Sequence, residues 1–426
     1  MPTPPNLSLQ RSLDLFARAQ SRIPGGSQTN SKRPAQFALG GYPIYAERGD
    51  GGRIVDVDGN EYIDLVQALG PVILGYRYPA VDAAIAAQLE RGIIYGLLSP
   101  LEVECAELIG EVVPCAEMVR FFKGGGEATA AAARVVRGYT RRQVILNCGY
   151  RGWPDVWSII TGDPGVPAAL AGSVVPFGEF DLAAVERQFQ AHRGQVAAVF
   201  LDIQRTVPPP GYLAAIKELC HANGALLVYD EIVTGFRLAL GGMQDYCGVT
   251  PDLACFAKAM ANGMPLACVA GRADVMESMA ARTISITYGG EALSLAAAIA
   301  TIRELRDQQV HAYLWKLGEF LQRGLNDAAQ EADLPFHCGG LAPMTTMTFT
   351  ETGGQPEALL WEYLLQEMAV RGVLLRRGGL NFLTFRHTQA DLAQVVAAAA
   401  EVFTNLRLLW GTAQLAAAVA GRKQGQ

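Results

Sequence analysis

The most informative stretch of this 426-residue chain reads ALLVYDEI and covers residues 225–232. Four apolar residues and a tyrosine lead directly into two carboxylates, Asp230 and Glu231. An apolar run without polar alternation is typical of a parallel strand that is buried on both faces. Because open α/β sheets bind ligands at the carboxyl ends of such strands, we expect Asp230 at a binding site. The structural alternative is that Asp230 or Glu231 caps the next element or pairs with Arg237.

Helical patterns alternate with short apolar runs along the middle of the chain. The spacing predicts helices over 81–91, 102–112, 127–139 and 212–222, and strands over 144–146, 196–201, 226–229 and 266–270. This alternation predicts βαβ crossovers and a mostly parallel central sheet with helices on both faces, which is an α/β fold.

The two ends of the chain have a different rhythm. The spacing predicts a helix over 9–22, a hairpin over 54–64 around Asp58-Gly59-Asn60, helices over 291–306, 310–329, 356–370 and 389–409, a strand over 344–349, and a frayed tail over 416–426. We therefore expect an N-terminal arm with a small antiparallel segment (1–65), a large α/β domain (66–310) and a C-terminal α+β domain (311–426).

Three glycines, Gly124, Gly125 and Gly126, stand between an apolar strand pattern and a helix rich in alanine. Glycines let the backbone approach a ligand closely, and the N-terminus of the following helix attracts anions. The motif therefore indicates a phosphate cup. It matches neither GxxxxGK[ST] nor a full GxGxxG, so a plain strand-to-helix turn is the alternative.

A lysine, Lys258, follows Asp230 by 28 residues and lies between Cys-Phe-Ala and Ala-Met-Ala. Such neighbours predict burial, and a buried ammonium is costly unless it is paired or neutralised. Desolvation frees the lone pair of the amine, which suits a lysine that forms a Schiff base. The alternative is a lysine whose ammonium reaches solvent from a partly buried helix.

Together, a phosphate cup, a buried Asp at a strand end and a desolvated Lys are the three contacts that pyridoxal phosphate requires. The order of these features along the chain also agrees with this cofactor. Asp230 would pair with the pyridinium nitrogen, and Lys258 would hold the aldehyde as an imine.

Here the chain resembles the class III aminotransferases among the fold-type I pyridoxal-phosphate enzymes, especially the branch of glutamate-1-semialdehyde aminomutase. The likeness extends from about residue 10 to about 405. It is carried by IPGG (23–26), DVDG (56–59), GGGEA (124–128), GYRG (149–152), DEIVTGFR (230–237), PDL (251–253) and Lys258.

The resemblance implies a role for each matching residue. Tyr150 would stack on one face of the pyridine ring and Ile232 would pack on the other. Asp230 would face the ring nitrogen, Lys258 would form the Schiff base, and Asp202 would belong to the cofactor-binding set. Gly124, Gly125 and Gly126 would lie at the phosphate, and Thr287 would reach the phosphate of the neighbouring subunit, which implies a homodimer with shared active sites.

Several residues depart from the family pattern. Gly124-Gly125-Gly126 replaces Ser-Gly-Thr, Arg151 stands where histidine is common, and Asp202-Ile203 replaces Glu-Pro. The segment 287–295 looks like a subgroup that acts on sugar-derived carbonyls, including aminoglycoside-pathway transaminases. Acidic residues near the site, Glu291 and Asp202, would suit a polycationic substrate, with capping or ion pairing as the alternative. Candidate substrate contacts at the mouth are Arg151, Tyr95 and the arm 27–33.

Composition excludes several classes of protein. With 35 basic and 41 acidic side chains, the formal net charge is −6, and no dense Lys/Arg run offers a surface for nucleic acid or an anionic membrane. No signal peptide or uninterrupted membrane-spanning run is evident. The eight cysteines lack CxxC pairs and the histidines are isolated, so we expect free thiols, a cytoplasmic protein and no metal site.

These features predict an enzyme that uses pyridoxal 5'-phosphate and its pyridoxamine form to move an amino group between an amine and an aldehyde or ketone. The resemblance of segment 287–295 implies an amino-sugar or aminoglycoside scaffold. The first alternative is an epimerase or aminomutase with the same cofactor. A catalytically idle binding or scaffold protein is the second alternative, and the retained Asp230, Lys258 and Tyr150 argue against it.

Overall fold

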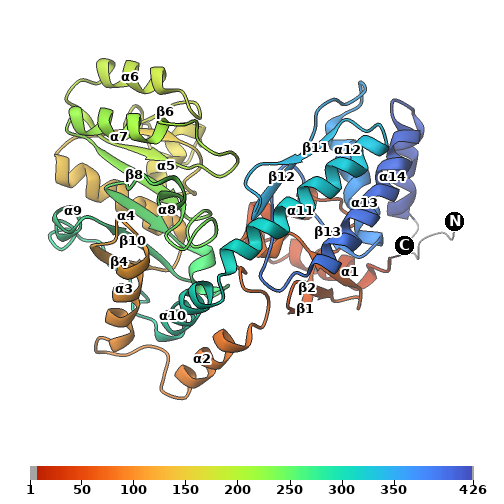
Figure 1. Cartoon of the computed structure of the whole chain (residues 1–426), viewed down its shortest axis with the longest axis horizontal. Helices are drawn as coiled ribbons and strands as arrows, with labels where there is room; N and C mark the ends of the chain where they lie inside the picture. The colour runs from red at the N-terminus through yellow and green to blue at the C-terminus, as the bar shows by residue number, and fades with distance from the viewer. Residues whose placement is uncertain (1–6, 425–426) are drawn as a thin grey trace. The chain divides into compact units, whose positions relative to one another are not determined.

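The computed structural model describes residues 7–424 and divides the chain into two compact units. One unit is continuous, Pro79–His311. The other is built from the chain up to Tyr78 together with the chain from Ala312 onward. Figure 1 shows the elements of both units in chain colours.

The continuous unit contains a seven-stranded sheet in the order β4-β10-β9-β8-β7-β5-β6. Its strands are β4 (Met118–Phe122), β5 (Val144–Cys148), β6 (Val174–Pro176), β7 (Val196–Leu201), β8 (Leu226–Glu231), β9 (Leu253–Phe256) and β10 (Ala267–Gly271). β6, β5, β7, β8 and β9 run parallel, and β10 is antiparallel to both of its neighbours. This confirms the mostly parallel sheet.

The helices of this unit are α2 (Pro79–Leu89), α3 (Pro100–Val112), α4 (Gly125–Thr140), α5 (Asp155–Ser158), α6 (Leu182–Ala191), α7 (Tyr212–Ala222), α8 (Met243–Cys247), α9 (Ala273–Glu277) and α10 (Ala292–Asp307). Of these, α3, α4, α7 and α9 pack on strands of the sheet, and α2 packs against α10 (Figure 1). α4 contacts β4, β7, β9 and β10. Its small buried residues, such as Ala128 and Ala132, let it lie close to Phe200 and Val228 in the core.

The second unit holds two small sheets, with the orders β1-β2-β3-β13 and β11-β12-β14. Their strands are β1 (Ala46–Asp50), β2 (Arg53–Asp56), β3 (Glu61–Asp64), β11 (Phe336–Gly339), β12 (Met344–Phe349), β13 (Val373–Leu374) and β14 (Leu380–Phe382). Asp56 stabilises the β2–β3 turn, because its Oδ1 accepts hydrogen bonds from the backbone N–H groups of Asp58 (3.0 Å) and Asn60 (2.8 Å). The predicted hairpin is therefore present.

The helices of this unit are α1 (Gln10–Gln20), α12 (Glu357–Val370), α13 (Gln389–Leu409) and α14 (Gln414–Gln424), together with α11 (Val310–Glu331) from Ala312 on. The frayed tail predicted from residue 416 is wrong for its described part. The helix α14 forms there because Leu415 and Val419 are buried and α14 packs on α12.

Of the described helices, α13 is long and apolar enough to cross a membrane by length and composition alone. Its side chains Leu392, Val395, Val402 and Phe403 are buried inside the unit. The same test is passed by core helices, and α13 packs against α12 as a core helix does.

Candidate active site

The residues predicted to carry chemistry gather at the carboxyl edge of the parallel strands. In register, Cys148 of β5 lies opposite Leu201 of β7, and Leu201 lies opposite Tyr229 of β8. Asp230 lies opposite Cys255 of β9. The ends of these strands therefore meet at one edge of the sheet. Asp230 lies at the end of β8, and the segments that follow the other strands carry Tyr150, Arg151, Asp202 and Lys258.

The glycine-rich loop reaches the same edge. Because β4 and β9 are both antiparallel to β10, β4 points in the same direction as β9, and Gly124 follows its carboxyl end. Glu127 fixes the loop, since its Oε2 accepts hydrogen bonds from the backbone N–H groups of Lys123 (3.0 Å) and Gly124 (2.9 Å). Helix α4 then begins at Gly125, so its first N–H groups lack partners within the helix.

The glycines allow two loops to pack closely above this helix terminus. A Cβ atom added to Gly125 would lie 3.0 Å from Ile232, and one added to Gly152 would lie 3.3 Å from the Cα of Gly126. Thr129 ties the loops together because its hydroxyl donates to the carbonyl of Arg151 (3.0 Å). The loop at this helix terminus is thus lined by backbone, and its role as a phosphate cup stays a prediction.

Asp230 is buried and forms an ion pair with Arg151. The Nη1 atom of Arg151 lies 3.2 Å from Oδ2 of Asp230 and 3.6 Å from Oδ2 of Asp202, and the Arg151 side chain is fully buried. The other oxygen of Asp230, Oδ1, accepts a hydrogen bond from the N–H of Ile232 (3.0 Å). Asp202 also accepts a hydrogen bond from Gln204.

The two carboxylates influence each other electrostatically. Burial and the charge of Asp230 together raise the pKa of Asp202 to about 7, even though Arg151, Gln204 and Lys258 act in the opposite direction. Burial also raises the pKa of Asp230, and the charges of Arg151 and Lys258 lower it. The guanidinium is therefore the main counter-charge of a buried pair of acids.

Arg151 corrects one prediction. The sequence placed it among substrate contacts at the mouth, yet its side chain is enclosed between Asp202, Asp230 and the carbonyl of Cys148. Its position directly after the exposed Tyr150, three residues beyond the end of β5, gave no sign of burial. A signal was present in the pattern itself, because a buried acid at a strand end demands a cationic partner.

Glu231 has a structural role, which is the capping of the next element that the sequence offered as an alternative. Its carboxylate accepts hydrogen bonds from the N–H groups of Met243 (2.7 Å) and Gln244 (3.1 Å) at the start of α8 and from the hydroxyl of Thr234 (2.6 Å). It therefore caps α8, while Asp230 pairs with Arg151.

Lys258 opens a short 3₁₀ turn, Lys258–Ala261, directly beyond β9. Its neighbours Phe256, Ala257, Ala259 and Met260 are buried as predicted, and Lys258 itself is half-buried. Its φ of 48° lies in the left-handed region, which is uncommon for a residue with a side chain. Such strain persists only where the surrounding structure imposes it, and it is concentrated at functional sites.

The aromatic residue assigned to one face of the cofactor ring is available. Tyr150 is 74% exposed, whereas Ile232, assigned to the other face, is half-buried against the core. Trp153, three residues after Tyr150, is also exposed. The stacking roles of Tyr150 and Ile232 stay predictions.

The loop that carries Thr287 lies beside β4. Thr287 is exposed at the start of a turn over 287–290, and a Cβ added to Gly289 would lie 3.3 Å from the carbonyl oxygen of Phe121. Glu291 caps α10, accepting from Leu293 N–H (2.7 Å), and pairs with Lys123 at 2.9 Å. The sequence reading missed Lys123 as the partner of Glu291, because the two are 168 residues apart.

The remaining predicted contacts are less informative. Tyr95 is partly exposed, and its hydroxyl donates to the carbonyl of Arg91 (2.9 Å). The arm 27–33 belongs to the other unit. Within residues 7–424, no group of three or more His, Cys, Asp or Glu side chains could hold a metal ion.

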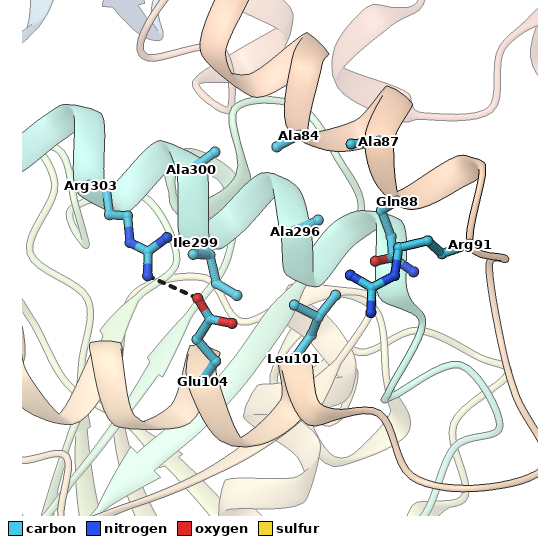
Figure 2. A pocket seen from close by; sticks show the side chains of 10 residues that line it. All are labelled: Ala84, Ala87, Gln88, Arg91, Leu101, Glu104, Ala296, Ile299, Ala300 and Arg303. Atoms are coloured by element: carbon cyan, nitrogen blue, oxygen red, sulfur yellow. Dashed lines mark hydrogen bonds and ion pairs between the residues drawn. The ribbon is translucent and has the colours of Figure 1, made fainter.

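A separate surface cavity of about 220 Å³ lies between α2, α3 and α10 (Figure 2). Figure 2 shows Glu104 and Arg303 joined across one end of it, with a distance of 2.8 Å. Its lining, which includes Ala84, Ala296 and Ile299, contains none of the predicted site residues.

Comparison with known proteins gives this geometry its context. The pattern of the family Aminotransferase class-III matches residues 38–152 and 179–401. A 3-aminobutyryl-CoA aminotransferase of Cloacimonas acidaminovorans is 34% identical, over 94% of this chain and 98% of the relative. A glutamate-1-semialdehyde 2,1-aminomutase of Roseiflexus castenholzii is 36% identical, over 93% and 98%.

Solved structures agree with these sequence relatives. The FumI protein of Sphingopyxis sp. MTA144, solved with PLP, has a TM-score of 0.87 at 27% identity and covers 94% of this chain and 97% of its own. An omega-transaminase of Sphaerobacter thermophilus has a TM-score of 0.83 at 27% identity and covers 93% and 98%. The fold is that of the fold-type I pyridoxal-phosphate transferases, and the chain belongs to the class III aminotransferase family of pyridoxal-phosphate enzymes.

Proposed function

We propose that this enzyme moves an amino group between an amino donor and the carbonyl carbon of an aldehyde or ketone, with Lys258 as the residue that holds the cofactor and moves the proton. The observation that carries the proposal is the meeting of Lys258, Asp230 and the Gly124–Gly126 cup at one edge of the sheet. Each is supplied by a different strand end.

The residues at this edge fit pyridoxal phosphate. The N–H groups of Gly125 and Gly126 would hold the phosphate, because a Cβ at Gly125 would fill the cradle against Ile232. Asp230 would accept the ring N–H, and Tyr150 and Ile232 would lie at the two faces of the ring. When bound, the cofactor supplies an electron sink for the carbon that loses its proton.

Lys258 would serve this chemistry as general base and then as general acid. Its Nζ would take a proton from the substrate carbon and later give it back, so one amine would serve in both roles. The strained turn at Lys258 holds the amine beyond the end of β9. Asp202 acts next to Asp230 and not on the substrate, because it is buried in its pair with Arg151.

The proposed substrate class has two branches. The relative named 3-aminobutyryl-CoA aminotransferase favours an aliphatic amine beside an acyl group. The narrower branch, an amino-sugar or aminoglycoside, is supported by the resemblance of segment 287–295. Charge does not add to that support, because Glu291 is engaged with Lys123 and the α10 terminus, and Asp202 is engaged with Arg151.

An aminomutase or epimerase is the second candidate function. It is favoured by two relatives named glutamate-1-semialdehyde 2,1-aminomutase, at 36% and 35% identity. Such an enzyme would move nitrogen within one molecule or invert one carbon without an external acceptor. Solvent deuterium that enters the substrate with no acceptor present would favour this candidate, whereas acceptor-dependent formation of a ketone would favour transamination.

The test of the proposed function is capture of the cofactor followed by a substrate panel. Protein reconstituted with pyridoxal phosphate is treated with borohydride, which fixes the cofactor to the lysine that holds it. We expect this cofactor label on the peptide that contains Lys258. Lys258→Ala should not be labelled, and its turnover should fall by at least ~10²-fold. Lys217→Ala, on α7, should keep both the labelling and the turnover of the wild type. Labelling elsewhere, or full turnover in Lys258→Ala, would overturn the proposal. A panel of β-amino acids, amino-sugars and α-amino acids then identifies the donor.

We also propose a cytoplasmic homodimer. The link between α2 and α3 exposes Ile93, Ile94, Tyr95, Leu97 and Leu98, and the last two are 86% and 87% exposed. A run of this kind favours burial against a second copy. The cytoplasm is supported by the eight cysteines, all of which are free thiols.

A further inference from the structure

We propose that Arg151 and Asp202 are positioning residues that set how strongly Asp230 holds the proton of the cofactor ring nitrogen. The inference rests on the proposed role of Asp230. Arg151 lies between the two acids, with its Nη1 at 3.2 Å from Asp230 and 3.6 Å from Asp202. These two residues are also two of the departures from the family pattern, and they are bonded to each other.

The geometry occupies one acceptor position on each oxygen of Asp230. Its Oδ1 is held by the N–H of Ile232 and its Oδ2 by the guanidinium of Arg151. Arg151 is itself fixed, because it also donates to the carbonyls of Tyr150 (3.2 Å) and Cys148. A carboxylate oxygen has a second acceptor position, so the ring N–H can still bind, but it shares the acid with a permanent cation.

The charges of the three side chains act as one group. When both acids are ionised, two carboxylates and one guanidinium sum to a single negative charge, and their side chains are 0% to 6% exposed. In such a site the field is weakly screened, so removing one member changes the charge that the ring nitrogen meets. The other ionisable groups facing Asp230 are Lys258 and Cys255, on the β9 side.

The arrangement predicts an order among charge variants. Asp202→Asn leaves Arg151 and Asp230 with no net charge, so the ring nitrogen should lose its proton at lower pH than in the wild type. Arg151→Gln leaves two carboxylates, so it should lose the proton at higher pH, with a shift of about 1 to 3 pH units. The double variant restores one negative charge and should return close to the wild type.

The experiment is a pH titration of the ring nitrogen in holoenzyme reconstituted with ¹⁵N-labelled pyridoxal phosphate, read by its NMR chemical shift. The apparent pKa of the ring nitrogen should be lowest in Asp202→Asn, intermediate in the wild type and the double variant, and highest in Arg151→Gln. Arg151→Lys keeps the charge and should stay near the wild type. Arg142→Gln is the control, because Arg142 bonds to the carbonyls of Val196 and Asn223 at the opposite edge of the sheet.

A second measurement separates this role from a structural one. The dissociation constants of pyridoxal phosphate and of its 1-deaza analogue, which has carbon in place of the ring nitrogen, are compared in each variant. Asp202→Asn and Arg151→Gln should each change the ratio of the two constants by about tenfold or more, whereas the double variant, Arg151→Lys and Arg142→Gln should leave the ratio near its wild-type value. A fold defect would change both constants equally. Equal titration curves, or an unchanged ratio, would overturn the inference. Failure of wild-type Lys258 to be labelled would instead overturn the proposed function.

Discussion

Asp230 and Cys255 face each other in the parallel register of β8 and β9. Lys258 follows Cys255 by three residues, so the acid and the amine leave adjacent strands at the same edge. This register, and not closeness in sequence, brings the two groups into one site. The predictions below test the site, the assembly and the fold that hold them there.

Gly125→Ala should weaken cofactor binding. Its new Cβ would lie 3.0 Å from Ile232, so either Ile232 or the loop must move. Overpacking of this size costs about 1 to 3 kcal/mol, which corresponds to about 5- to 150-fold in the dissociation constant of pyridoxal phosphate. Fluorescence titration measures this dissociation constant. Gly421→Ala, where a Cβ meets open space, should bind normally, and Gly125→Ala/Ile232→Ala should recover part of the loss. Normal binding by Gly125→Ala would show that the cup is not the phosphate site.

Mixing two inactive variants should restore activity if sites are shared between subunits. A heterodimer of Lys258→Ala and Thr287→Ala has one site with both defects and one intact site. Random exchange of subunits should therefore recover about a quarter of the wild-type sites, measured as turnover at limiting cofactor. Each variant mixed with itself is the control. Absence of recovery, with subunit exchange confirmed by mass spectrometry, would place Thr287 outside the partner's site.

Leu97→Glu/Leu98→Glu should dissociate the proposed dimer. Both leucines are exposed within one subunit, and a buried unpaired carboxylate at each would oppose association. We expect the dimer dissociation constant to rise by about 100-fold or more in sedimentation experiments. Leu408→Glu, at a leucine that is 74% exposed on α13, is the matched control. An unchanged dimer would show that the interface lies elsewhere.

His387 should make the stability of its unit depend on pH. Burial lowers the pKa of His387 to about 4, and its neutral ring accepts from Thr384 N–H (3.2 Å) and contacts the carbonyl of Gly52 (3.1 Å). Because the folded pKa lies below the ordinary value of 6.5, the unfolded chain takes up the proton first. Neutral His387 therefore contributes fully to the free energy of unfolding above pH 6.5. As the pH falls towards 4, this contribution of about 3 kcal/mol is lost.

The measurement is urea unfolding at pH 7 and pH 4.5. Between these two pH values, His387→Gln should lose less free energy of unfolding than the wild type, since the glutamine at position 387 does not titrate. His337→Gln, at an exposed histidine of β11, should behave as the wild type does. A wild-type loss equal to that of His387→Gln would contradict the prediction.

Local pattern determined most of the secondary structure. The apolar runs 196–201 and 344–349 and the helical spacing of 212–222 and 389–409 correspond to β7, β12, α7 and α13 at both ends. These elements have strong local patterns, and α13 also has a clear N-cap, because the Thr388 side chain accepts from Asp391 N–H. The described tail beyond Ala416 is helical, whereas the sequence predicted a frayed end. Its helix depends on burial of Leu415 and Val419 in the unit and not on local pattern.

By itself, the sequence determined the α/β class and the strand, glycine and helix motif around 124–126, because each is written in residues close along the chain. It also singled out Asp230 and Lys258, but the register of β8 and β9 brings these two residues to one edge of the sheet. Only the tertiary structure decided the partners of the buried charges. Arg151 meets Asp202 and Asp230 across 51 and 79 positions, and Lys123 meets Glu291 across 168. A buried charge signals that it needs a counter-charge, but which one it meets depends on the order of strands in the sheet.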